Sequence, residues 1–61
     1  MTKQTLYIDF AGSQFITWFY SEGIRYRGIA SAFYEDILRY KRKNDFTDMV
    51  ITGEARLFIK Y

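Results

Sequence analysis

The chain has 61 residues, which is enough for one small domain and too few for two. Hydrophobic residues make up 49% of it and charged residues 26%, a composition typical of globular rather than disordered chains. Cysteine and histidine are absent, so disulfides, the usual zinc and haem ligands, thiolate nucleophiles and imidazole bases are excluded. Six Tyr, six Phe and one Trp are left to supply the burial that such a small domain needs.

The net charge of +2 comes from one short segment. Four of the nine basic residues lie between positions 39 and 43, and without them five basic and seven acidic residues leave a charge of −2. This is less than the broad basic surface of a dedicated nucleic-acid binder. We therefore interpret the segment as the cationic end of a helix and keep nucleic-acid binding as its alternative use; its basic residues are Arg39, Lys41, Arg42 and Lys43.

Three segments near the N-terminus predict an antiparallel meander. Residues 5–10 and 24–29 alternate between apolar and polar side chains, as half-buried strands do. Residues 15–20 are rich in aromatic and β-branched side chains, which favour strands. Gly12-Ser13 between the first two segments predicts a type II′ hairpin turn, and Ser21-Glu22-Gly23 predicts the second turn.

Two-residue turns at both positions would define the register of the meander. Tyr7 would lie opposite Trp18, and Trp18 opposite Arg27, unless a bulge moves the later strand to the other face. One face would then carry Leu6, Ile8, Phe10, Phe15, Phe19, Ile24 and Tyr26. The other face would carry Tyr7, Ile16, Trp18, Tyr20, Arg25, Arg27 and Ile29.

Residues 31–43 predict the one helix. Ser31 is a suitable N-cap, and Asn44 suits the left-handed position that often ends a helix. Apolar residues recur at helical spacing and predict one packed stripe. They are Phe33, Tyr34, Ile37, Leu38 and Tyr40.

The tail alternates again over residues 46–51 and 57–61. Thr52-Gly53-Glu54 between them predicts a final hairpin, with one bent strand as the alternative. We therefore expect a single compact α+β domain over residues 1–61, a small antiparallel sheet in the order βββαββ with the helix on one face. The helix would pack against Leu6, Phe10, Phe19, Ile24 and Leu57.

A single helix can cover only one face of a sheet, so the second face should lack a cover. Its partner-binding candidates are Tyr7, Trp18, Tyr20, Arg25, Arg27, Arg56, Phe58 and Lys60. Trp, Tyr and Arg dominate the hot spots of protein interfaces. We therefore expect a protein partner, with a homodimer as the simplest version.

Two alternatives use the same residues. Aromatic rings stack on bases and arginines contact phosphates, so this face and the basic helix end could bind nucleic acid, although Asp9, Glu22 and Glu54 would repel it. In the purely structural alternative, the aromatic side chains only stack on cross-strand arginines, as Trp18–Arg27 and Tyr20–Arg25 pairs.

Catalysis is not expected. Ser13, Ser21 and Ser31 have no base to activate them, and the neighbouring carboxylates of Glu35 and Asp36 point in different directions on the helix. No phosphate-binding glycine motif or metal-ligand pattern occurs, so no cofactor or metal is expected.

The longest apolar run, residues 15–20, is too short to cross a membrane, and the N-terminus does not resemble a signal peptide. We therefore expect a cytoplasmic protein. Its size favours an adaptor or an inhibitor of a larger macromolecular machine, of phage or mobile-element origin.

Overall fold

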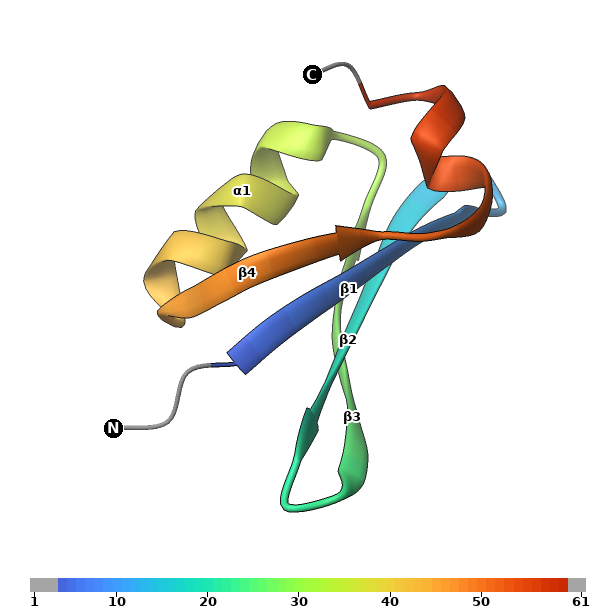
Figure 1. Cartoon of the computed structure of the whole chain (residues 1–61). Helices are drawn as coiled ribbons and strands as arrows, with labels where there is room; N and C mark the ends of the chain where they lie inside the picture. The colour runs from blue at the N-terminus through green and yellow to red at the C-terminus, as the bar shows by residue number, and fades with distance from the viewer. Residues whose placement is uncertain (1–3, 60–61) are drawn as a thin grey trace.

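The computed structural model describes residues 4–59. Its elements are β1 (Gln4–Ala11), β2 (Gln14–Ser21), β3 (Ile24–Ser31), α1 (Tyr34–Lys43), β4 (Phe46–Ile51) and a short 3-10 helix, η1 (Gly53–Leu57). The strands form one sheet in the order β3-β2-β1-β4, and α1 packs across one face of it (Figure 1). The predicted α+β fold, with its antiparallel meander and one helix, is confirmed.

Both hairpins have the predicted two-residue turns. Ala11 pairs with Gln14 and Ser21 with Ile24, which places Trp18 between Tyr7 and Arg27 as expected. The first turn is type I′ rather than type II′, because Ser13 has a positive φ of 67° as well as Gly12 at 60°. A type I′ turn suits the right-handed twist of the flanking strands.

A bulge interrupts the pairing of β2 with β3 at Thr17, where the register shifts between Ile16 and Trp18. Gly28 and Ile29 together oppose Thr17, which is fully buried. The Thr17 hydroxyl accepts a hydrogen bond from the Ile29 N–H (2.8 Å) and donates one to the Ile29 carbonyl (3.0 Å). A Cβ on residue 28 would overlap Thr17 Oγ1, so only glycine fits there. Because of the bulge, Ile29 packs against the core instead of lying wholly on the second face.

The predicted C-terminal hairpin is wrong. β4 pairs in parallel with β1, with Leu6 opposite Met49 and Ile8 opposite Ile51, and α1 makes the crossover that parallel strands need. The N–H and the hydroxyl of Thr52 both donate to the Ile8 carbonyl, each at 2.8 Å. The chain then enters η1 instead of returning as a strand.

The tail turns into η1 because its apolar residues also fit a helical spacing. Ala55 and Ile59, four residues apart, are both buried in the core. Leu57, predicted to face the helix, is instead 80% exposed. Phe58 packs against Phe10 over the end of β1, with ring centroids 4.1 Å apart.

The core lies between the sheet, α1 and η1. Its buried apolar residues are Leu6, Ile8, Phe15, Ile37, Phe46, Ala55 and Ile59.

The predicted start of the helix at Ser31 is corrected. The helix begins at Tyr34, because Ser31 is the last residue of β3. The Ser31 hydroxyl accepts the Phe33 N–H (3.1 Å) and donates to the Asp36 carboxylate (2.6 Å). Phe33 therefore precedes the packed stripe and is 70% exposed.

Two smaller predictions are also corrected. The left-handed residue after α1 is Asp45 (φ 59°), whereas the Asn44 side-chain amide donates to the Tyr40 carbonyl at 3.0 Å. Ile24, predicted to pack under the helix, is exposed, because the β2–β3 hairpin extends beyond α1 (Figure 1).

Candidate functional site

The candidate site is the face of the sheet away from α1, called the aromatic/arginine face below. Strand pairing arranges its side chains in rows across the sheet. One row runs Val50, Tyr7, Trp18, Arg27 from the β4 edge to the β3 edge. Two residues away from this row on each strand, Thr5 pairs with Asp48, and Tyr20 pairs with Arg25. Extending the β1–β2 register by two residues places these two pairs in a second row, Asp48, Thr5, Tyr20, Arg25.

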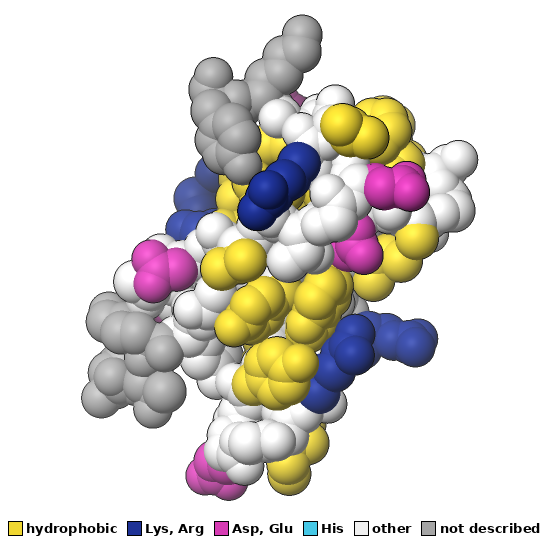
Figure 2. All heavy atoms as spheres, turned by 45° about the vertical axis from the view of Figure 1, so that its right-hand side comes forward, with side chains coloured by type: hydrophobic (Ala, Val, Ile, Leu, Met, Phe, Trp, Pro, Cys, Tyr) yellow, Lys and Arg dark blue, Asp and Glu magenta, His cyan; other side chains and the backbone are white. Residues whose placement is uncertain are grey.

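Three aromatic rings form a continuous strip at the centre of this face. Tyr7 and Trp18 are stacked, with centroids 5.8 Å apart and an interplanar angle of 11°. Tyr20 meets the edge of Tyr7 at 5.7 Å and 85°. Tyr20 remains 48% exposed, and Val50 extends the strip as an exposed apolar side chain. Figure 2 shows apolar side chains gathered along the middle of this side of the molecule.

The two arginines come from β3 and differ in their contacts. The Arg25 guanidinium lies over the Trp18 indole, 4.9 Å from the ring centroid. This corrects the predicted stacking pairs, Trp18–Arg27 and Tyr20–Arg25. Arg25, the diagonal neighbour of Trp18, covers the indole instead, because a long side chain can reach across two positions on a strand. Within residues 4–59 the ion pair seen is Arg39–Asp36 on α1, and neither Arg25 nor Arg27 contacts a carboxylate.

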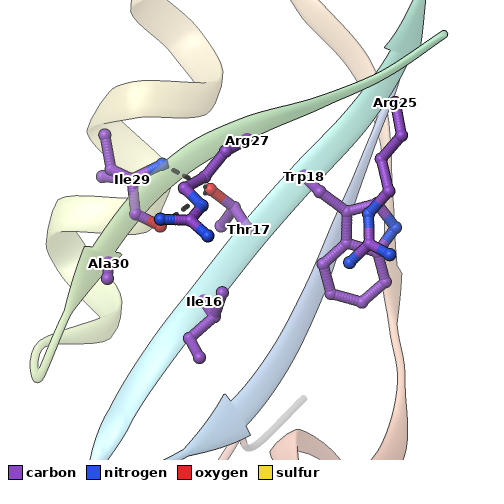
Figure 3. A pocket seen from close by; sticks show the side chains of 7 residues that line it. All are labelled: Ile16, Thr17, Trp18, Arg25, Arg27, Ile29 and Ala30. Atoms are coloured by element: carbon purple, nitrogen blue, oxygen red, sulfur yellow. Dashed lines mark hydrogen bonds between the residues drawn. The ribbon is translucent and has the colours of Figure 1, made fainter.

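A shallow groove of about 590 Å³ runs between β2 and β3 where the bulge lies. Its lining residues are Ile16, Thr17, Trp18, Arg25, Arg27, Ile29 and Ala30. Figure 3 shows Arg25 beside the indole and Arg27 reaching over the groove from β3. The groove thus combines an apolar floor with two exposed guanidinium groups, which suits a ligand that is both apolar and acidic.

The structure brings together five of the eight predicted partner-binding residues: Tyr7, Trp18, Tyr20, Arg25 and Arg27. It does not bring Arg56 or Phe58 to them. Arg56 lies in η1, where its Nε donates to the Ile51 carbonyl (3.3 Å), and Phe58 packs on Phe10. Lys60 lies outside the described residues.

The basic helix end is separate from this face. Arg39, Lys41, Arg42 and Lys43 belong to α1, which packs on the opposite side of the sheet (Figure 1). Arg39 is also engaged with Asp36 at 3.1 Å.

Sequence reasoning missed Asp48, Val50 and Thr5 as members of the face. They join it through the parallel pairing of β4 with β1. The pattern of residues 46–51 predicts a strand but carries no signal for the edge of the sheet that it joins.

Comparison with family models, curated proteins and solved structures finds no match to this chain. In the part of the chain that the structure describes, no three acidic side chains are grouped to hold a metal ion. No helix among residues 4–59 has both the length and the apolar character needed to cross a membrane.

Proposed function

We propose that the protein is a non-enzymatic binding module that docks onto a protein partner through its aromatic/arginine face. The observation that carries this proposal is the stacked, partly exposed strip of Tyr7, Trp18 and Tyr20 beside two arginines. Trp, Tyr and Arg are the residues that contribute most to protein interfaces. Neither arginine is neutralised by a carboxylate among residues 4–59, so both can accept an acidic group of a partner.

Nucleic acid is the second candidate, since stacking rings beside arginines also suit single strands. Two observations disfavour it. Asp48 and Asp9 share the face with the arginines and would repel phosphates. The four basic residues of the helix end lie on the other side of the sheet, so a strand bound to the aromatic rings could not use them.

An oligonucleotide titration separates the two candidates. Trp18 is the one tryptophan of the chain, so its emission reports on this face. We expect no quenching when a random single-stranded oligonucleotide is added at low salt. Quenching that weakens with a log–log salt slope of about −3, as neutralising four or five phosphates would give, would overturn the proposal.

A charge-reversal pair sharpens the titration. If nucleic acid binds this face, Arg25→Glu with Arg27→Glu abolishes the quenching, while Lys41→Glu with Lys43→Glu leaves most of it. Under our proposal, the oligonucleotide does not quench Trp18 emission in the wild type or in either double variant.

The finer role that we propose is that of an adaptor, or of an inhibitor that covers part of a larger machine, in the cytoplasm. Its support is the small size of the chain and its lack of histidine and cysteine, which leaves few groups for catalysis.

A further inference from the structure

We propose that the partner of the aromatic/arginine face is a second copy of this chain. The two copies pack face to face about a two-fold axis parallel to the strands, with Arg25 of each copy paired to Asp48 of the other. This inference rests on the proposed function, namely that this face docks onto protein.

The first step is the distribution of charge across the face. Arg25 and Arg27 lie on β3, at one edge of the sheet, and Asp48 lies on β4, at the opposite edge. The aromatic strip occupies β2 and β1 between them. Figure 2 shows basic side chains on one flank of the apolar strip and an acidic side chain on the other, with further acidic side chains near the upper end of the strip. The face is therefore positive at its β3 edge and negative at its β4 edge, with the aromatic strip between them and a second carboxylate, Asp9, beyond one end of that strip on β1.

The second step is symmetry. A two-fold axis parallel to the strands places β3 of one copy over β4 of the other, and β2 over β1. Arg25 and Asp48 belong to the same row of the sheet, so this rotation leaves them at the same height along the strands. Both Arg25–Asp48 contacts then form together, and Trp18 of each copy meets Tyr7 of the other.

The alternative axis is disfavoured by the same charges. A two-fold axis in the plane of the face but perpendicular to the strands would place β3 over β3. Arg25 and Arg27 of one copy would then lie against the same arginines of the other, and like charges across an interface are unfavourable. The charge pattern therefore selects one of the two face-to-face arrangements.

The third step is the distance that the Arg25 and Asp48 side chains must bridge, together with the area of the face. Packed sheets lie about 10 Å apart, a gap that a long arginine and a short aspartate can bridge together. Arg25 and Asp48 are both exposed, so neither has to leave a buried site. Four strands at a spacing of about 4.8 Å make a face only about 20 Å wide, so we expect a weak dimer that forms at micromolar or higher concentration.

Reciprocal charge reversal tests this arrangement by sedimentation of the full chain up to about 0.5 mM. Arg25→Glu alone and Asp48→Arg alone each bring like charges together at both contacts, so we expect each to weaken the homodimer at least about tenfold. Asp48→Arg leaves the Arg25–Trp18 contact in place and is the cleaner of the two variants. Lys43→Glu, the same charge change on α1, should leave the dimer unchanged.

Mixing the two single variants gives the decisive result. In a heterodimer of Arg25→Glu with Asp48→Arg, both contacts again join opposite charges, so the equimolar mixture should dimerise more tightly than either variant does alone. Failure of the mixture to recover the dimer, or single variants that dimerise like the wild type, would overturn the inference.

The outcomes also separate this inference from the proposed function. A dimer weakened by Trp18→Ala but indifferent to both charge reversals would retain protein docking and reject this arrangement. A wild-type chain that stays monomeric at about 0.5 mM would exclude the second copy as partner. Salt-sensitive binding of the oligonucleotide would instead overturn protein docking itself.

Discussion

At the scale of single residues, one buried hydroxyl shapes the strand that carries both arginines. Thr17 is fully buried, and both of its hydrogen bonds go to the backbone of Ile29 in the β3 bulge. The bulge separates the regular pairing of Arg25 and Arg27 from the end of β3 that leads into α1. The hydroxyl therefore satisfies the backbone groups that the extra residue would otherwise leave without partners.

We predict that Thr17→Val lowers the free energy of unfolding by about 1–3 kcal/mol, because the Ile29 N–H loses its buried acceptor. Thr17→Ser keeps the hydroxyl and removes one methyl group, which costs about 1 kcal/mol. Urea unfolding followed by Trp18 emission compares the two variants. A valine variant as stable as the wild type would contradict this role of the hydroxyl.

The bulge itself could not be derived from the sequence. In the sequence, Gly28 only interrupts the alternation of apolar and polar residues in the strand. Nothing in its local sequence links it to Thr17, eleven residues earlier in the chain. The two turns were predictable because Gly12 and Gly23 accept positive φ and the strands beside them are long enough to show their alternation.

At the scale of elements, local patterns predicted the meander and the helix, and failed for the tail. Hairpins pair neighbouring segments, so their register follows from turn length alone. A parallel strand such as β4 pairs with β1, more than forty residues earlier in the chain, and no local pattern specifies that choice. The apolar residues of the tail fit two periods, and the burial of Ala55 in η1 and of Ile59 just after it decides in favour of the helical one.

The tail yields a prediction that separates η1 from a hairpin. Phe58→Ala should lower the free energy of unfolding by about 1 kcal/mol, because it removes the ring contact with Phe10, although Phe58 is 53% exposed. Leu57→Ala should cost less than about 0.5 kcal/mol, because Leu57 lies on the exposed side of η1. Thermal or urea unfolding measures both. The reverse order of costs would support the hairpin, in which Leu57 faces the core.

At the scale of the whole molecule, the fold has one covered and one uncovered sheet face. α1 and η1 supply buried residues on one side, whereas the stacked rings of Tyr7 and Trp18 stay partly exposed on the other. Five residues of that face were predictable because they depend only on the two hairpin registers. Asp48, on which the proposed pairing of two copies depends, was not predictable, because its place depends on where β4 joins the sheet.

Light scattering after size exclusion, across a range of concentrations, tests most directly whether this face docks onto protein in the form that we propose. The wild-type mass should rise from 7.4 kDa toward twice that value as the concentration increases. Trp18→Ala should weaken the dimer by about 2 kcal/mol, or roughly thirtyfold, and stay near the monomer mass. Phe33→Ala, which removes a more exposed aromatic ring away from the face, should behave like the wild type. A wild-type mass of 7.4 kDa at every concentration, or a Trp18→Ala variant that dimerises as well as the wild type, would contradict the account.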